Sequence, residues 1–252
     1  MVLAALNADL EHRVEDRTQA LAEVNRELDA FAYSISHDLR APLRTMQGYA
    51  EALLEDFGEG LPPEGRHYTR RISAAATRME DLIADILAYS RLAKDEVSIR
   101  PEALEAVLDQ VLVDLEPMLS NTEAVVRVER PLPKVQANRA VLRQVLNNLI
   151  TNAVKFVRPG DRPTTSVHAE QRLSHVRVWI EDNGIGIAPE HQQRVFDPFQ
   201  RLHGVETYPG TGIGLAIVRR AVTRMGGACG VESKLGQGSR FWIELRSVEQ
   251  DG

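Results

Sequence analysis

The chain has 252 residues, a formal net charge of −6 and 43% hydrophobic residues. This length predicts about two domains with buried cores. The acidic balance argues against general nucleic-acid binding, and the single cysteine, Cys229, excludes an internal disulfide and a cysteine-based metal cluster. No run approaches the ~18 apolar residues of a membrane span and no signal peptide is recognisable, so we expect a cytoplasmic protein.

Residues 3–35 show the heptad pattern of a coiled coil. Apolar residues recur seven apart in two series, through Leu3, Leu10, Val24 and Phe31 and through Val14, Leu21, Leu28 and Ile35. Arg17 interrupts the first series and Asn7 occupies the first position of the second. The helix starts directly after Met1, which predicts that this chain is a fragment of a longer one.

A helical hairpin is expected next. The apolar stripe of its first helix runs through Leu39, Leu43, Met46, Ala50, Leu53 and Phe57, and that of its second helix through Ile72, Ala75, Met79, Leu82, Ile86 and Tyr89. Glycines and prolines between residues 58 and 63 separate the two helices. Two helices with one stripe each cannot bury both stripes alone, so we expect a dimeric four-helix bundle. The coiled coil and the hairpin together form the predicted domain 1–94.

The second predicted domain, 95–252, mixes strands and helices. Alternating apolar residues predict strands at 125–128, 176–180 and 241–245, and helical stretches are expected at about 102–119, 138–157 and 213–225. This combination predicts an α/β sandwich.

The helix at 138–157 carries polar residues inside a strong apolar pattern. Asn148, Asn152 and Lys155 lie at positions i, i+4 and i+7 and therefore share one face. Amide oxygens suit Mg²⁺, and a lysine suits phosphate. An ordinary solvated face explains the same pattern equally well.

The segment 181–187, Glu-Asp-Asn-Gly-Ile-Gly-Ile, follows an alternating strand. Asp182 continues the apolar face of that strand, and a buried carboxylate needs hydrogen-bond donors. The exocyclic amine of adenine would supply one, and the two glycines allow a close backbone approach. The alternative is a tight turn capped by Asp182.

A glycine-rich loop at 210–214 runs into a helix, which makes an anion site at the helix N-terminus. Its spacing matches neither the Walker A loop nor the dinucleotide fingerprint. The preceding residues, 196–212, are expected to form a mobile lid, which is compatible with a disordered surface loop. Residues 236–241 are expected to form a hairpin turn before a strand.

The stretch Ser-Ile-Ser-His-Asp-Leu-Arg-Ala-Pro-Leu-Arg, residues 34–44, places His37 on the helix side opposite the apolar stripe. A lone helical histidine is usually a solvated surface residue, but a nucleotide pocket in the same chain would favour a nucleophile. Asp38 is expected to fix the tautomer of His37, or else to be a simple surface charge. Arg40 and Arg44 fit phosphate or partner contacts and a solvated face equally. Pro42 is expected to bend the helix at His37 and Asp38 and to create a two-state joint.

In order, these segments resemble the motifs of a sensor histidine kinase of two-component signalling. SHDLRAPL resembles the phospho-acceptor H box, NNLITNAVKF the N box, EDNGIGI and GTGIGLAIV the two glycine boxes, and FDPFQRL the F box. The resemblance covers nearly the whole chain, and it extends to phytochrome-like or PAS-linked kinases.

The resemblance implies a Bergerat-type ATP fold and Mg²⁺ as cofactor. It implies that Asn152 ligates Mg²⁺, with Asn148 nearby, that Lys155 contacts phosphate, and that Asp182 accepts the adenine amine. It assigns the adenine wall to Gly184 and Gly186, the phosphates to Gly212 and Gly214, and further ATP contacts to Phe199, Arg201, Thr211 and Leu215.

The resemblance also implies that a homodimer autophosphorylates His37 and passes the phosphoryl group to an aspartate of a response-regulator receiver domain. Leu43, Met46 and Gln47 are expected at the docking surface, and a sensor domain is expected upstream. Transfer within one protomer or across the dimer depends on the handedness of the hairpin loop. Two other functions remain open, a catalytically silent dimeric scaffold and a chaperone or topoisomerase ATPase with the same ATP fold.

Overall fold

The computed structural model describes residues 2–94, 98–200, 208 and 210–248. Within the first helix, many side chains lie outside this description, including His37 and the eight apolar residues of the expected coiled-coil series. The chain divides into two compact units, residues 1–90 and 91–252. No helix of the described residues is long and apolar enough to cross a membrane.

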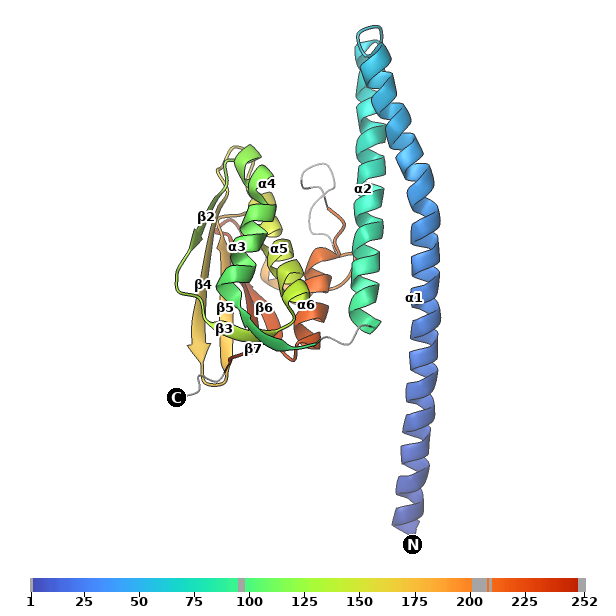
Figure 1. The fold of residues 1–252 in the computed structure, drawn as a ribbon, viewed down its shortest axis with the longest axis vertical. Helices are drawn as coiled ribbons and strands as arrows, with labels where there is room; N and C mark the ends of the chain where they lie inside the picture. The colour runs from blue at the N-terminus through green and yellow to red at the C-terminus, as the bar shows by residue number, and fades with distance from the viewer. Residues whose placement is uncertain (1, 95–97, 201–207, 209, 249–252) are drawn as a thin grey trace. The chain divides into compact units, whose positions relative to one another are not determined.

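The first unit is a hairpin of two long helices, α1 (Val2–Phe57) and α2 (Pro63–Lys94) (Figure 1). α1 ends at the predicted glycine-rich turn, where a Cβ on Gly58 would lie 2.1 Å from the carbonyl oxygen of Leu54. Arg66 in α2 donates a hydrogen bond to the Gly58 carbonyl oxygen at 3.0 Å. The turn is therefore fixed both by a glycine that no larger residue can replace and by a side chain from the second helix.

The hairpin buries a stripe of residues spaced mostly seven apart. It consists of Ser36, Leu43 and Ala50 on α1 and Thr69, Ala76, Ile83 and Leu87 on α2. Leu43, Ala76, Ile83 and Leu87 form one apolar cluster. Other members of the predicted stripes, such as Met46 and Ile72, remain exposed in this single hairpin.

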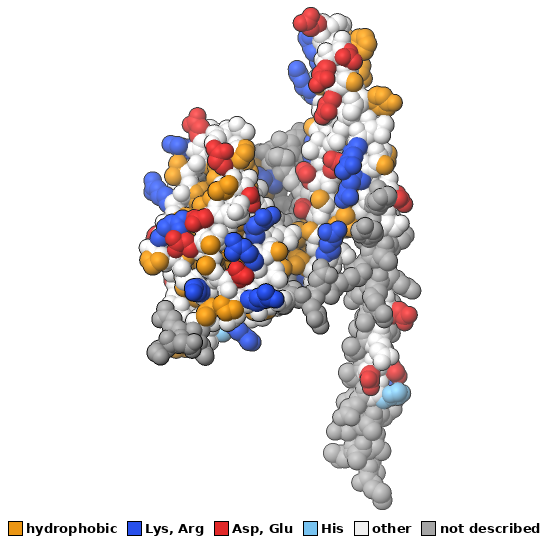
Figure 2. All heavy atoms as spheres, viewed as in Figure 1, with side chains coloured by type: hydrophobic (Ala, Val, Ile, Leu, Met, Phe, Trp, Pro, Cys, Tyr) orange, Lys and Arg blue, Asp and Glu red, His pale blue; other side chains and the backbone are white. Residues whose placement is uncertain are grey.

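Each helix also carries apolar side chains that remain exposed beside the buried stripe, and these form a second apolar stripe. Its exposed members are Leu39, Met46, Leu53 and Phe57 on α1 and Tyr68, Ile72 and Met79 on α2. Figure 2 shows apolar side chains at the surface along this hairpin, between charged ones. Because these side chains remain exposed in a single chain, the hairpin retains an apolar surface that a further helix pair would cover.

The second unit is an α/β sandwich, as predicted. Its elements are β1 (Arg100–Ala103), α3 (Leu104–Asp114), α4 (Glu116–Asn121), β2 (Val125–Val128), β3 (Lys134–Ala137), α5 (Arg139–Lys155), β4 (Thr164–Arg172), β5 (His175–Asp182), the 3-10 helix η1 (Pro189–His191), α6 (Gly214–Arg224), β6 (Ala228–Ser233) and β7 (Ser239–Arg246). The main sheet has the order β2-β4-β5-β7-β6, with β2 and β4 parallel and the other neighbours antiparallel. β1 and β3 form a separate antiparallel pair.

Helices α3, α5 and α6 cover one face of the main sheet (Figure 1). The covered face of its central strands consists of Val176, Val178 and Ile180 from β5 and Phe241, Ile243 and Leu245 from β7, all buried. The alternation that predicted these strands arises because every second side chain points to the helix-covered face of the sheet.

The three predicted strands are confirmed, whereas the pattern missed β1, β3, β4 and β6. The predicted helix at 102–119 is two helices that meet at Leu115, and Pro117 lies in the first turn of the second one. Proline has no N–H to continue the hydrogen-bond ladder and is favoured in a first helical turn, where that N–H would have no partner within the helix.

Candidate nucleotide-binding site

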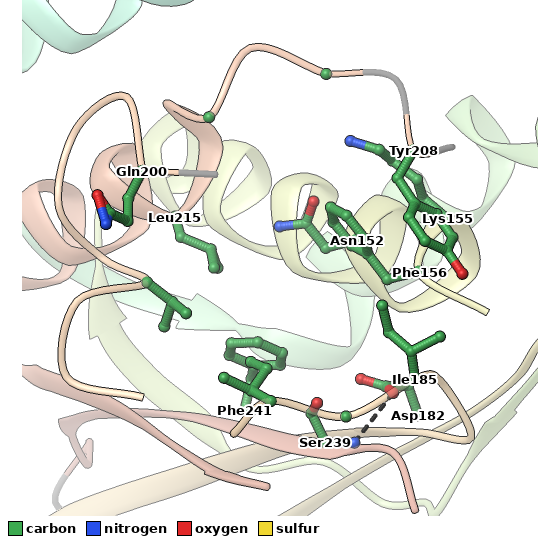
Figure 3. A pocket seen from close by; sticks show the side chains of 15 residues that line it. Asn152, Lys155, Phe156, Asp182, Ile185, Gln200, Tyr208, Leu215, Ser239 and Phe241 are labelled. Carbon is green, nitrogen blue, oxygen red and sulfur yellow. Dashed lines mark hydrogen bonds between the residues drawn. The ribbon is translucent and has the colours of Figure 1, made fainter. Parts of the chain in front are cut away.

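A pocket of about 740 Å³, partly open to solvent, lies in the second unit between α5, α6 and the end of β5. The lining residues are Asn152, Lys155, Phe156, Asp182, Ile185, Gly186, Ile187, Val195, Gln200, Tyr208, Gly210, Gly212, Leu215, Ser239 and Phe241. Figure 3 shows Asn152 and Lys155 on one side, with Asp182, Ser239 and Phe241 across from them.

Asp182 ends β5 with its carboxylate in the pocket. Its Oδ1 atom accepts hydrogen bonds from the backbone N–H groups of Gly184 at 2.8 Å and Ser239 at 3.0 Å (Figure 3). Burial raises the pKa of this carboxyl from 3.8 to about 6, against the lowering effect of both backbone hydrogen bonds. Among the described residues none donates to Oδ2, so this oxygen is an acceptor available to a ligand.

The glycines after Asp182 are required by backbone packing. A Cβ on Gly184 would lie 2.4 Å from the Phe156 carbonyl oxygen, where Ile185 N–H already donates at 2.9 Å. Gly186 has a φ of +71°, and a Cβ there would lie 2.1 Å from the carbonyl oxygen of Lys234. Gly186 lines the pocket, whereas Gly184 lies between Asp182 and the end of α5.

Helix α5 brings two of its three predicted polar residues to the pocket. Its N-terminus is capped by Asn138, whose side chain accepts from two backbone N–H groups at 3.1 Å. Asn152 and Lys155, near its C-terminus, line the pocket. Asn148 does not, because its Nδ2 donates to the Gln144 carbonyl oxygen at 3.0 Å and its Oδ1 lies 2.8 Å from the Cβ position of Gly214.

The second glycine segment lies across from α5. Gly212, with a φ of +76°, and Leu215 line the pocket, and α6 begins at Gly214. No side chain of the described residues caps this helix start, and the N–H groups at a helix N-terminus are suited to an anion. Thr211 is not a lining residue, and its hydroxyl accepts a hydrogen bond from the backbone N–H of Ile213 at 3.3 Å.

The F-box segment contributes residues that the sequence did not single out. Val195 and Gln200 line the pocket, whereas Phe199 is 63% exposed with a φ of +62° and is not a lining residue. Arg201 lies outside the described residues, as does much of the expected lid at 196–212.

The pocket also has an aromatic wall that pattern analysis missed. The Tyr208 and Phe156 rings are 5.4 Å apart, and the Lys155 ammonium lies 4.4 Å from the Phe156 ring centre. Phe156 follows the N-box lysine directly, so its position in the sequence could have indicated it. Tyr208 follows a stretch without clear periodicity and gave no such signal.

Comparison with known proteins decides the family. Residues 27–94 match the His Kinase A (phospho-acceptor) domain, and residues 137–249 match the Histidine kinase-, DNA gyrase B-, and HSP90-like ATPase domain. The chain belongs to the sensor histidine kinases. Both domain matches agree with the motifs recognised in the sequence.

Curated relatives match over most of this chain. Cyanobacterial phytochrome B of Nostoc sp. is 35% identical over 98% of the chain and 31% of the relative. Sensor protein DivL of Caulobacter vibrioides is 32% identical over 97% of the chain and 31% of the relative. The chain thus spans about a third of the length of these relatives.

Solved histidine kinase structures share the fold. Full-length ShkA in complex with AMPPNP is 32% identical, with a TM-score of 0.65 over 86% of this chain and 46% of that chain. The mycobacterial sensor histidine kinase MprB is 28% identical, with a TM-score of 0.52 over 59% of this chain and 97% of that chain.

The phospho-acceptor motif of this histidine kinase chain lies within α1. His37 is helical, but its side chain lies outside the described residues; its neighbours are a buried Ser36 and an exposed Asp38. α1 is continuous through Pro42. The carbonyl of Asp38 therefore lacks the N–H that residue 42 would normally offer, and the two-state joint expected there stays a prediction.

Within the described part of this kinase, no three His, Cys, Asp or Glu side chains converge as a metal site. Asn152 lines the pocket three residues before Lys155, the lysine of the N box, and its side chain carries an amide oxygen. A single amide oxygen suits Mg²⁺, which keeps several waters and takes further ligands from substrate phosphates.

Proposed function

We propose that the chain is the kinase portion of a two-component sensor. It binds Mg-ATP in the pocket, transfers the γ-phosphoryl group to His37, and passes it to an aspartate of a response-regulator receiver domain. The observation that carries this proposal is the pocket that joins Asp182, Asn152 and the glycine-rich start of α6 in a chain with a phospho-acceptor helix. The proposed domains are 1–94 for dimerisation and phosphotransfer and 95–252 for catalysis.

The proposed nucleotide orientation follows from the two ends of the pocket. The Oδ2 atom of Asp182 accepts the adenine amine, because a carboxyl with a pKa of about 6 is largely ionised above pH 7. Lys155 and the N-terminus of α6 contact the phosphates, and Asn152 supplies an amide oxygen to Mg²⁺. The AMPPNP complex of ShkA, an identified relative, supports an adenine nucleotide as the ligand.

The proposed reaction is an in-line phosphoryl transfer. Neutral His37 attacks the γ-phosphorus through Nε2, the bond to the β,γ-bridging oxygen breaks, and ADP leaves with that electron pair. Asp38 accepts the hydrogen bond of the Nδ1 proton and holds the tautomer that leaves Nε2 free. The product is a phosphoramidate, which is labile in acid and stable in base.

The exposed second stripe of the hairpin supports the homodimer. Seven large apolar side chains of this stripe remain exposed beside the hairpin core, among them Ile72 at 53% and Met79 at 45% exposure. A two-fold pairing of hairpins would bury them in a four-helix bundle. Of the expected docking residues for the receiver domain, Gln47 remains a candidate, because Met46 belongs to the stripe that the dimer would bury. Leu43, also expected there, is 1% exposed in the hairpin core and cannot contact a partner.

Ile72→Glu is expected to convert the dimer to a monomer, because it places a charge in the buried seam of the bundle. Ala74 is exposed and does not belong to the stripe, so Ala74→Glu adds the same charge outside the seam and should leave the dimer intact. Sedimentation equilibrium of both variants measures the mass. Two dimeric variants, or two monomeric ones, would contradict the assignment of this stripe.

Two other functions are distinguished by phosphorylation. A silent scaffold would bind nucleotide without labelling, and a chaperone or topoisomerase ATPase would lack the phospho-acceptor region that matches residues 27–94. Purified chain is incubated with Mg²⁺ and γ-labelled ATP, as wild type and as His37→Gln. We expect acid-labile, base-stable label on wild type and none on His37→Gln. Equal labelling of both proteins would refute the proposal.

A further inference from the structure

Gln192 ties two backbone segments together beside the adenine end of the pocket. Its Nε2 group donates to the carbonyl oxygen of Ser233 at 2.7 Å and to that of Ile187 at 3.1 Å. An amide NH₂ has two donors, and both are used here. Ile187 is a pocket wall at the end of the first glycine segment, and Ser233 ends β6.

The same contacts continue to the carboxylate that is proposed to hold adenine. The Ser233 hydroxyl accepts from the backbone N–H of Ile187 at 2.8 Å and lies 2.9 Å from the Ser239 hydroxyl. The backbone N–H of Ser239 donates to Asp182 Oδ1 at 3.0 Å. Gln192 is therefore linked to Asp182 through two residues, Ser233 and Ser239, each of which makes one hydrogen bond towards either side with a different group.

Gln192 also belongs to the segment that forms another wall of the pocket. It follows η1 and precedes Val195, which lines the pocket and whose N–H donates to the carbonyl oxygen of His191 at 3.0 Å. Farther along, Asp197 accepts from Arg219 of α6 at 2.8 Å. The segment is thus fixed to β6 by Gln192 and to α6 by Asp197.

The geometry points to Gln192 as a positioning residue for adenine-nucleotide binding in the proposed kinase reaction. It touches no proposed reacting atom, and its contacts lie at the Asp182 end of the pocket rather than at the Asn152 end. Its loss loosens Ile187 and the Val195 wall and weakens nucleotide binding. The phosphates remain held by the other end, so the rate at saturating ATP is retained.

The test compares Gln192→Ala with Gln193→Ala in the full chain. Gln193 is exposed, and within the described residues its side chain makes no hydrogen bond, so it is a matched control. We expect Gln192→Ala to raise the dissociation constant of Mg-ADP and the KM for ATP about tenfold, as two lost hydrogen bonds predict. The labelling rate at saturating ATP should stay within about twofold of wild type, and Gln193→Ala should resemble wild type.

Gln192→Glu keeps the side-chain size, but an ionised glutamate has no donor for the carbonyl oxygens of Ile187 and Ser233. This variant replaces Gln192→Ala if urea titration shows that the alanine variant is not stably folded. It should weaken Mg-ADP binding at least as much. Unchanged Mg-ADP affinity in the folded Gln192 variants, or a loss of saturating rate alone, would overturn the assignment. If the wild-type chain bound no Mg-ADP, that result would instead refute the proposed nucleotide-binding function.

Discussion

Asp182→Asn is expected to weaken Mg-ATP binding by about 100-fold while making the nucleotide-free chain more stable. The carboxylate is desolvated, which raises its pKa to about 6, and asparagine removes this buried charge. An asparagine Oδ1 can still accept the backbone N–H groups of Gly184 and Ser239, but its Nδ2 then opposes the adenine amine with a second donor. The lost charged hydrogen bond and the opposed donors account for the expected loss of binding.

The stability gain has a defined pH dependence. The folded-state pKa of about 6 exceeds the ordinary value of 3.8, so the folded chain binds the Asp182 proton more readily than the unfolded chain. The shift corresponds to about 3 kcal/mol of destabilisation above pH 6, which is relieved as the pH falls through 6 and is absent below 3.8. Asp182→Asn should therefore gain about 2 kcal/mol at pH 7.5 and progressively less towards pH 4.

Urea unfolding of the nucleotide-free chain at several pH values measures this gain, and calorimetric titration measures Mg-ATP binding. Glu190→Gln is the matched control, because it removes one exposed carboxylate a few residues away. A variant that is destabilised at pH 7.5, or that binds Mg-ATP like wild type, would show that Asp182 has a structural role instead.

Gly186→Ala is expected to destabilise the second unit by about 3 kcal/mol more than Gly226→Ala and to abolish Mg-ADP binding. Both glycines have nearly the same left-handed conformation, with φ of +71° and +72°. A Cβ at residue 186 would lie 2.1 Å from the Lys234 carbonyl oxygen, whereas nothing lies within 4 Å of one at residue 226. The difference between the two variants thus measures the clash apart from the backbone strain.

Urea unfolding of both alanine variants of the full chain gives this comparison. Gly226→Ala should lose about 1 kcal/mol, the strain of a side chain in the left-handed region, and should bind Mg-ADP normally. Equal losses in the two variants would mean that the segment after β5 can move away from the β6–β7 turn, and that Gly186 is not fixed by packing.

The sequence predicted those pocket residues whose arrangement depends on a single helix or strand. Asn152 and Lys155 share a helix face, and Asp182 follows directly on an apolar strand face, so spacing made them candidates beside a solvated face and a turn cap. Ser239 and Gln192 were missed because their contacts depend on pairing between distant strands. β5 pairs with β7, which brings Ser239 to Asp182, and β6 brings Ser233 to Gln192.

The hairpin shows the same limit for apolar patterns. The sequence contains enough apolar residues for two stripes on each helix, and periodicity alone cannot say which stripe faces the neighbouring helix. The structure separates Leu43 and Ile83, which are buried together, from Met46 and Ile72, which are exposed. That separation moved Leu43 from the expected docking surface to the core and provides the surface proposed for dimerisation.

The most direct measurement is the position of the transferred phosphoryl group on the intact chain. After incubation with Mg-ATP, the chain is digested at alkaline pH and its peptides are analysed by mass spectrometry. We expect one phosphoryl group on the peptide that carries His37, absent when ATP is replaced by ADP. A phosphoryl group on a serine, threonine or aspartate instead, or an unmodified chain that nevertheless binds Mg-ATP, would contradict transfer from the pocket to the histidine.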